Sequence, residues 1–279
     1  MREIQASAIT EAVREMCMEA NYTLSQDMRE RFEESARQEK SPIGRQIFRQ
    51  LEENLKIAGE DLIPICQDTG MAVVFLKIGQ EVHVTGNITE AINEGVRQGY
   101  ADGYLRKSVV KDPIQRENTR DNTPAVIHYE VVDGDRIEIT VAPKGFGSEN
   151  MSRVFMLKPA DGLEGVKEAI LTAVRDAGPN ACPPMVVGVG IGGTFEKCAL
   201  MAKHALTRDL NETSPVPYVR ELEEEMLCRI NKLGIGPGGL GGVITAMAVN
   251  IETYPTHIAG LPVAVNICCH VNRHVKRTI

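Results

Sequence analysis

The chain has 279 residues, of which 43% are hydrophobic and 25% are charged, and its formal net charge is -7. These fractions are typical of a soluble globular protein, and the acidic balance argues against the basic groove by which most nucleic-acid-binding proteins hold phosphates. The apolar runs are far shorter than a membrane span, and the first residues contain no apolar signal core. We therefore expect a cytoplasmic protein with neither a nucleic-acid nor a membrane partner.

The first quarter of the chain is predicted to be helical. Apolar residues between Ile4 and Cys17 recur at spacings of three to four, which marks one face of a helix. Ser25 can cap a second helix that reaches about Gln38, and Ser41 followed by proline starts a third that ends near Gly59.

The pattern then changes to strands. Residues 71–78 are apolar enough for a buried strand, and residues 125–132 and 136–141 flank an Asp-Gly-Asp turn that predicts a hairpin. The other predicted elements are a strand at 81–85, a helix at 88–105, an exposed loop at 111–122, helices near 162–177, 195–207 and 216–233, and strands at 185–191, 243–251 and 262–267.

These elements predict an α/β fold, with a helical N-terminal region followed by mixed β-sheets flanked by helices. The sequence contains no internal repeat, no low-complexity segment and no long linker. We therefore expect a single catalytic domain over residues 1–279.

Seven cysteines in no dense framework argue against a disulfide-stapled secreted protein. Three of them fall in helix-like stretches and are predicted to pack as small buried hydrophobes, namely Cys17, Cys198 and Cys228. Cys66, Cys182 and Cys269 lie in glycine- or proline-rich loops instead. Three thiolates brought together by folding can hold an iron–sulfur cluster and leave one iron open, and an open metal position distinguishes a catalytic site from a structural one.

Three glycine-rich segments add to this pattern. The run starting at Gly188 has the G-x-G-x-x-G spacing of dinucleotide sites, but Asp209, at about the right distance for the ribose, follows a helical stretch rather than a strand. The segments 144–150 and 234–242 could let backbone N–H groups converge on an anion or a cluster, or could simply form tight turns. Their occurrence beside three loop cysteines favours a shared pocket.

Read together, these stretches resemble the alpha subunit of the two-subunit, iron–sulfur (class I) fumarate hydratases. The resemblance spans nearly the whole chain and rests on residues 66–70 (Cys-Gln-Asp-Thr-Gly), 144–150, 182–194 and 256–270. Tartrate dehydratase alpha subunits share most of these motifs.

The resemblance implies that Cys66, Cys182 and Cys269 ligate a four-iron four-sulfur (4Fe-4S) cluster, with Cys269 preferred over Cys268 because the family cysteine directly precedes the histidine that matches His270. It also implies acid–base roles for Asp68 and His257, and a substrate pocket lined by Gln67, Arg106 and the Gly147 loop. Phe146 and Gly238 depart from the residues more usual in their loops.

The same resemblance implies reversible hydration of fumarate to malate, with the open iron as Lewis acid. It further implies that the remaining substrate-binding arginines, a lysine and a catalytic threonine come from a second segment, either fused or supplied as a beta subunit. We therefore expect a hetero-oligomer with a beta subunit, a small dicarboxylate substrate, and no activity from the chain alone.

Four alternatives remain open at this stage. The nearest is dehydration of tartrate or another hydroxy-diacid on the same cluster. An electron-transfer protein is less favoured, because its clusters usually have four cysteine ligands, often in C-x-x-C pairs, and this sequence has no such pair. The others are a nucleotide-dependent oxidoreductase that uses the Gly188 run and a metal-free binding protein with ordinary core cysteines.

Overall fold

The computed structural model describes residues 2–279, which divide into two compact units. Unit 1 consists of residues 2–25, 54–146 and 273–279, and unit 2 consists of residues 26–53 and 147–272. The fold is of the predicted α/β class, with helices first and mixed sheets after them. Whether residues 1–279 act as a single domain stays a prediction.

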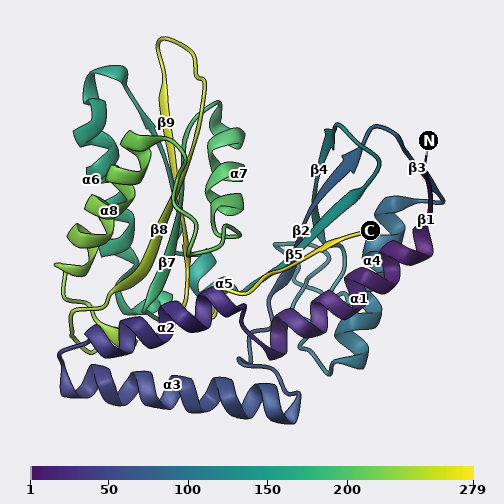
Figure 1. The fold of residues 1–279 in the computed structure, drawn as a ribbon, viewed down its shortest axis with the longest axis horizontal. Helices are drawn as coiled ribbons and strands as arrows, with labels where there is room; N and C mark the ends of the chain where they lie inside the picture. Colours follow the sequence, from purple (N-terminus) through teal and green to yellow (C-terminus); the bar gives the residue numbers. More distant parts are fainter. Residues whose placement is uncertain (1) are drawn as a thin grey trace. The chain divides into compact units, whose positions relative to one another are not determined.

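Unit 1 is built on a four-stranded sheet with the order β10-β5-β2-β4 (Figure 1). Its strands are β2 (Met71–Gly79), β4 (Val126–Val132), β5 (Ile137–Lys144) and β10 (Val275–Thr278), and a separate parallel pair joins β1 (Arg2–Gln5) to β3 (Val82–Thr85). The helices α1 (Ala6–Tyr22) and α4 (Ile88–Asp102) share one hydrophobic core with β2 and β5. They approach closely because Gly95 and Gly99 face α1, where a Cβ at either position would lie 2.6 Å from a carbonyl oxygen.

The predicted hairpin at residues 125–141 is wrong. Both strands exist, but β2 lies between them, parallel to β4 and antiparallel to β5. The most apolar of the three strands, β2, thus takes the position between the other two, whereas β4, which has no fully buried residue, lies at the edge of the sheet. The Asp-Gly-Asp turn crosses the end of β2, and a Cβ on Gly79 would lie 2.3 Å from the Gly134 carbonyl oxygen.

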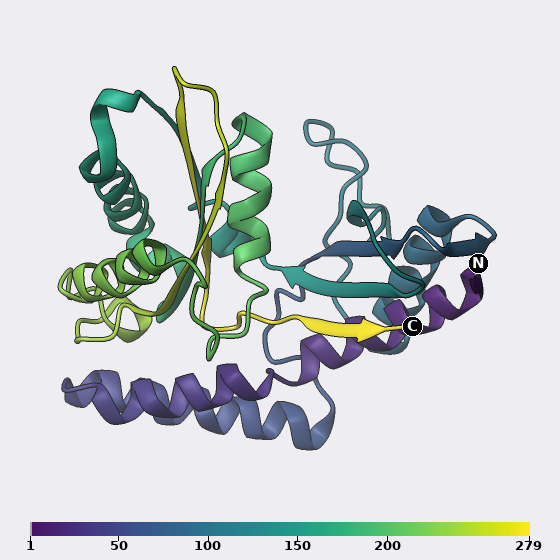
Figure 2. The same ribbon diagram turned by 45° about the horizontal axis from the view of Figure 1, so that its top comes forward.

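Unit 2 contains a second four-stranded sheet with the order β6-β9-β7-β8. Its strands are β6 (Arg153–Leu157), β7 (Met185–Gly192), β8 (Ala246–Tyr254) and β9 (Leu261–Cys268). The helices α6 (Gly162–Ala177) and α8 (Pro217–Asn231) cover one face, and α7 (Phe195–Ala205) covers the other (Figures 1 and 2). Its remaining helical pieces are α2 (Gln26–Gln38), the first part of α3 (Pro42–Asp61), most of the short α5 (Phe146–Glu149), and the 3-10 turns η1 (Pro159–Asp161), η2 (Gly178–Ala181) and η3 (Pro237–Gly239).

The glycine run that begins at Gly188 serves helix packing. Gly188 and Gly190 lie inside β7 and face α7, where a Cβ would come within 2.2 Å and 2.1 Å of helix carbonyl oxygens. The dinucleotide fingerprint places its glycines in the loop between strand and helix, where they approach a pyrophosphate. Here the glycines allow a helix to lie directly on a strand.

Apart from the hairpin, most predicted elements are confirmed, and the other exceptions are short strands and one cysteine. The strands β1, β6 and β10 were not expected, and the strand predicted at 243–251 begins only at Ala246. Cys17 and Cys198 are buried as predicted, but Cys228 is exposed. It lies on α8 between Met226 and Ile230, which belong to the buried face of that helix.

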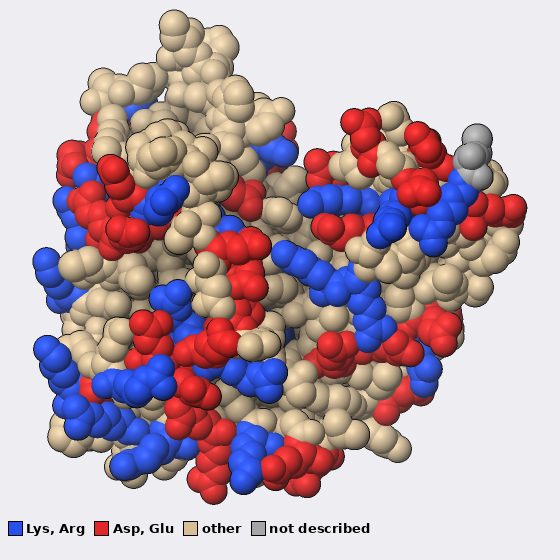
Figure 3. All heavy atoms as spheres, viewed as in Figure 1, with Lys and Arg blue, Asp and Glu red and all other residues tan. Residues whose placement is uncertain are grey.

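No helix within residues 2–279 is long and apolar enough to cross a membrane. Acidic and basic side chains also alternate along α2, where Arg31 pairs with Glu34 at 3.7 Å and Arg37 with Glu33 at 3.8 Å (Figure 3). This helix therefore presents a mixed surface rather than a basic patch.

Candidate active site

The first predicted site segment, residues 66–70, leads directly into β2. Because Met71 pairs with Lys144 in the antiparallel β2–β5 ladder, residues 66–70 lie beside the segment 144–146 at the end of β5. Gly70 has a φ of +78°, and a Cβ there would lie 2.7 Å from the Lys144 backbone. Two of the segments singled out in the sequence are thus brought together within unit 1.

Cys66 follows Ile65, whose N–H and carbonyl groups are both hydrogen-bonded. The Ile65 N–H donates to the Asn21 carbonyl at 2.9 Å, and the Asn54 side chain donates to the Ile65 carbonyl at 2.9 Å. The half-buried Cys66 Sγ accepts the N–H of Asp68 at 3.4 Å. Hydrogen bonds of this kind stabilise a thiolate and tune the potential of iron–sulfur clusters, so this turn suits a cluster ligand.

The Asp68 carboxylate is held between its own turn and the neighbouring segment. Its Oδ1 accepts the Gly70 N–H at 3.1 Å, and its Oδ2 accepts the Phe146 N–H at 2.9 Å. A Cβ at position 145 would lie 2.9 Å from Oδ2, so Gly145 leaves the space that the carboxylate occupies. The carboxylate is therefore preorganised, and each oxygen keeps a further lone pair for a substrate or a proton.

Tyr100 of α4 stabilises this turn through hydrogen bonds to its main chain. Its hydroxyl is fully buried and donates to the carbonyls of Thr69 at 2.8 Å and Gly70 at 3.0 Å, while Asn122 donates to the Gly70 carbonyl at 3.2 Å. Burial raises the pKa of Tyr100 well above its ordinary value, so the hydroxyl keeps its proton and stays a donor. No sequence pattern indicated this role, because it depends on tertiary contact between α4 and the turn.

The predicted substrate-binding residues of unit 1 lie at the same place. Thr69 Oγ1 donates to the Arg106 carbonyl at 3.1 Å, which brings the main chain of Arg106 next to the turn. The side chains of Gln67 and Arg106 are not buried. Gly147, by contrast, begins the second segment of unit 2 and is exposed, and a Cβ there would meet nothing within 4 Å.

Arg273 is a residue of this region that sequence reasoning missed. Its side chain is buried and donates to the Pro143 carbonyl at 3.3 Å and to the Asp68 carbonyl. Its Nη1 is buried and has no hydrogen-bond partner among the described residues. A buried guanidinium that joins the Asp68 main chain to the end of β5 adds positive charge behind the turn. Its place four residues after Cys269 was the only signal in the sequence.

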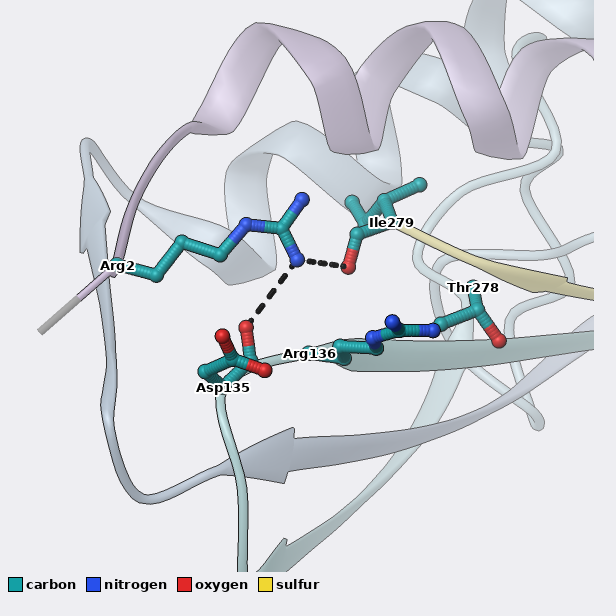
Figure 4. Close-up of a pocket in the computed structure, with 5 residues that line it drawn as sticks. All are labelled: Arg2, Asp135, Arg136, Thr278 and Ile279. Carbon is teal, nitrogen blue, oxygen red and sulfur yellow. Dashed lines mark hydrogen bonds between the residues drawn. The ribbon is translucent and has the colours of Figure 1, made fainter.

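A pocket of unit 1 lies away from this turn (Figure 4). It is lined by Arg2, Asp135, Arg136, Thr278 and Ile279, and Arg2 donates to the carbonyls of Asp135 at 3.2 Å and Ile279 at 3.3 Å. It adjoins the start of β5, whereas the Cys66 turn adjoins its end. None of the predicted site residues lines it.

Unit 2 brings Cys182 and Cys269 to the same end of its sheet. Cys182 precedes β7, Cys269 follows β9, and the antiparallel register pairs Val186 with Cys268. The His270 N–H donates to the Cys182 carbonyl at 3.3 Å, and His270 Nδ1 lies 3.1 Å from the same oxygen. The Cys182 side chain is exposed and that of Cys269 is half-buried, whereas Cys268 is buried in the strand.

The glycine-rich segment 234–242 lies against the Cys182 turn from another side. The Gly238 N–H donates to the Pro183 carbonyl at 2.9 Å, and a Cβ on Gly239 would lie 2.3 Å from Pro179. Glycine segments thus lie beside two of the loop cysteines, 144–146 beside Cys66 in unit 1 and 234–242 beside Cys182 in unit 2. The single shared pocket stays a prediction.

His257 is not brought together with the unit 2 cysteines. It is exposed in the loop between β8 and β9, which extends past the end of the sheet in Figures 1 and 2. Cys269 follows the opposite end of β9, and the eight residues of this strand span about 23 Å at roughly 3.3 Å per residue. The Ala259 N–H donates to His257 Nδ1 at 3.2 Å, which holds the ring within its own loop.

The loop cysteines have the donor chemistry that a 4Fe-4S cluster requires. Burial raises the pKa of Cys17 to about 12 and also raises that of Cys198, so these two remain thiols. Cys66, Cys182 and Cys269 are instead half-buried or exposed in turns. Among residues 2–279, no three His, Cys, Asp or Glu side chains are grouped around a single metal-ion position. A cluster does not need such a group, because each cysteine ligates a different iron atom.

Comparisons with known proteins give the family. The family model described as Fumarate hydratase (Fumerase) matches residues 10–278. A Methanocaldococcus jannaschii protein named "Putative L(+)-tartrate dehydratase subunit alpha" is 42% identical over 278 residues, which cover 97% of each chain. The L(+)-tartrate dehydratase subunit alpha of Escherichia coli (strain UTI89 / UPEC) is 31% identical over 268 residues, or 95% of this chain and 88% of that protein.

These matches and the two cysteine-bearing turns define the chain as an enzyme of the hydro-lyase class. More particularly, it belongs to the fumarate hydratase (Fumerase) family.

Proposed function

We propose that this chain is the alpha subunit of an iron–sulfur hydro-lyase that removes water from a four-carbon hydroxy-dicarboxylate. The observation that carries the proposal is the pairing of Cys182 and Cys269 at one end of the unit 2 sheet, with their main chains joined through the His270 N–H at 3.3 Å. Family membership and the Cys66 turn support it.

The proposed ligands are Cys66, Cys182 and Cys269. When bound, a 4Fe-4S cluster with one open iron would supply a Lewis acid for the substrate hydroxyl and an adjacent carboxylate oxygen. The Cys66 turn already offers an N–H to its sulfur.

Asp68 is the proposed acid–base residue. Dehydration requires loss of a weakly acidic C–H proton and departure of hydroxide, and a positioned carboxylate can accept the first proton or supply one to the second group. The two backbone N–H bonds to Asp68 fix its direction. Arg106 and Gln67 lie unburied beside the same turn, where a guanidinium can hold a substrate carboxylate and stabilise the charge that accumulates on it.

His257 remains a predicted partner in proton transfer, under a geometric condition. Because β9 separates it from Cys269, it can act at a cluster only if it comes from another copy of the chain. Mixing His257→Ala chains with Cys269→Ser chains in the presence of the beta subunit tests this role, since each variant alone is expected to be inactive and a mixed oligomer would recover activity. If His257→Ala alone keeps full activity, the residue is not catalytic.

Two substrates are proposed. The relatives named as tartrate dehydratase alpha subunits favour L(+)-tartrate, whose dehydration gives the enol of a keto-dicarboxylate, and the family description favours malate and fumarate. Because the relatives are named as alpha subunits, we also propose that a beta subunit completes the active site. Assays of both substrates, with and without the beta subunit, decide between them.

The primary test is iron and acid-labile sulfide per chain after anaerobic purification. We expect about four of each, lost when Cys66, Cys182 or Cys269 is changed to serine and kept in Cys228→Ser, because Cys228 is exposed on α8. Activity should decay in air and return with iron and reductant. Neither iron nor sulfide after anaerobic reconstitution would overturn the proposal.

A further inference from the structure

A second carboxylate, that of Glu39 in unit 2, is completely buried although it lies just after the surface helix α2. Its Oε1 accepts the N–H groups of Lys40 and Ser41, each at 2.8 Å, and that of Val243 at 3.1 Å. Its Oε2 accepts the N–H groups of Val243 at 3.1 Å and Ile244 at 2.9 Å. Backbone N–H groups from two distant segments therefore converge on one carboxylate.

Glycines make room for this arrangement. A Cβ on Gly44 would lie 2.8 Å from the Glu39 side chain, and a Cβ on Gly242 would lie 2.8 Å from both carboxylate oxygens. Burial disfavours the charged form, but the backbone donors outweigh it and hold the pKa of Glu39 below its ordinary value. The Glu39 carboxylate thus carries a negative charge that holds Val243 and Ile244 through their N–H groups, beside Gly242.

The fastened segment leads to the Cys182 turn. Residues 242–244 end the glycine-rich loop, which closes on itself through the bond from the Gly241 N–H to the Ile235 carbonyl at 2.9 Å. From this closed loop, the Gly238 N–H donates to the Pro183 carbonyl at 2.9 Å. The glycine-rich loop therefore contacts the Glu39 carboxylate at one end and Pro183, the residue after Cys182, through Gly238.

We propose that Glu39 is a positioning residue for Cys182: it fixes the glycine-rich loop, and the loop fixes the turn that presents the Cys182 thiolate to the cluster. The role as cluster ligand rests on the proposed function. The mechanical coupling of Glu39 to the Cys182 turn does not, and it can be measured with or without iron.

The test is hydrogen exchange at single-residue resolution on the full chain, comparing wild type with Glu39→Gln. Glutamine replaces one of the two accepting oxygens by an NH2 group, which cannot accept a hydrogen bond from the backbone N–H groups that it faces. We expect exchange of the Val243, Ile244 and Gly238 amides to rise about tenfold or more, since it reports local opening. The next two amides, of Thr245 and Ala246, bond to Asn231 Oδ1 at 2.8 and 2.9 Å and provide an internal control.

A matched variant separates coupling from general destabilisation. Glu223→Gln removes another buried carboxylate of unit 2, one that accepts the Ile251 N–H at 2.7 Å. It should speed exchange at Ile251 and leave Gly238 unchanged. Faster exchange at Val243 and Ile244 with an unchanged Gly238 would overturn the proposal, as would equal acceleration of all unit 2 amides.

Iron release gives a readout on the cluster itself. In the anaerobically reconstituted chain, a chelator should remove iron several-fold faster from Glu39→Gln than from Glu223→Gln, with Glu39→Asp between Glu39→Gln and wild type. Equal release rates would overturn the role toward the cluster. If Glu39→Gln does not fold, wild type suffices: the Ile244 and Gly238 amides should open with the same dependence on denaturant, and unequal dependence would refute the coupling.

Discussion

The Cys66 turn of unit 1 and the Cys182 turn of unit 2 are stabilised in different ways. Side chains brace the Cys66 turn, with Tyr100, Asn122 and Arg273 all donating to main-chain carbonyls of residues 68–70. At the Cys182 turn the main-chain N–H groups of His270 and Gly238 donate to consecutive carbonyls, and within the described residues the side-chain contact with these carbonyls is that of His270 Nδ1, at 3.1 Å from the Cys182 oxygen. The Cys66 turn therefore depends on the identity of the neighbouring side chains. The Cys182 turn depends mainly on the position of the neighbouring main chain.

This difference determines where substitutions act. A bond from a side chain is removed by changing that residue, whereas a bond from a backbone N–H survives almost any substitution at its own position. For the Cys182 turn, the sensitive positions are those that place the donating backbone. These are the carboxylate of Glu39 and the glycines that permit close approach, such as Gly239 against Pro179.

The largest expected effect separates the adjacent cysteines at the end of β9. Cys269→Ser should leave the chain almost without iron, whereas Cys268→Ser should keep about four iron atoms per chain, because Cys268 is buried in the strand and Cys269 lies just past it. Iron and sulfide analysis of both variants, purified side by side without oxygen, is the measurement. Loss of iron from Cys268→Ser alone would reverse the assignment.

The next effect concerns chemistry at the Cys66 turn. Asp68→Asn should keep the cluster but lower kcat by about 10²–10⁴-fold, as expected when an acid–base group is lost. The control is Asp112→Asn, because Asp112 also accepts two backbone N–H groups of unit 1, at 2.8 and 2.7 Å, but in an exposed loop. More than a tenth of wild-type kcat in Asp68→Asn, with iron retained, would show that Asp68 is not the acid–base residue.

A smaller effect tests the side-chain bracing directly. Tyr100→Phe leaves the Thr69 carbonyl without the donor at 2.8 Å and should lower the free energy of unfolding by about 1–3 kcal/mol. Iron should also be released faster than from Tyr22→Phe, which loses a comparable bond to the Gly103 carbonyl at 3.0 Å. Urea unfolding and chelator kinetics measure both quantities. Equal iron release from the two variants would mean that Tyr100 supports the unit but not the turn.

Much of this fold could be predicted because its helices and long strands carry strong periodic patterns. Strand pairing could not be predicted so well, since the Asp-Gly-Asp signal indicates a reversal of direction and not which strand lies alongside. The short edge strands β1, β6 and β10 bury few residues and leave little pattern. Cys228 shows the same limit on a helix, where a shift of two positions from Met226 turns a side chain from core to solvent.

The candidate site was predictable only in part, for a related reason. Cys66, Cys182 and Cys269 were singled out by their glycine and proline contexts and by the family resemblance, and their role as ligands stays a prediction. Tyr100 and Glu39 were not, because each acts through a backbone that the fold brings near from 30 to 204 positions away. His257 shows a different limit. The family resemblance singled it out, but the sequence did not indicate that it lies at the opposite end of β9 from Cys269.

The smallest expected effect is the pH dependence of the stability that the Glu39 carboxylate contributes to the folded chain. Because the folded-state pKa of Glu39 lies below its ordinary value, the carboxylate stabilises the folded chain above the unfolded pKa of about 4.3 and loses that contribution as the pH falls through the folded value. The difference in unfolding free energy between wild type and Glu39→Gln should therefore be constant from about pH 8 to about pH 6 and narrow below about pH 4. Urea unfolding of the cluster-free proteins at each pH measures it. A difference that stays constant down to about pH 3 would mean that the negative charge of Glu39 does not contribute to the free energy of unfolding. The Cys182 turn would then differ from the Cys66 turn only in the geometry of its hydrogen bonds.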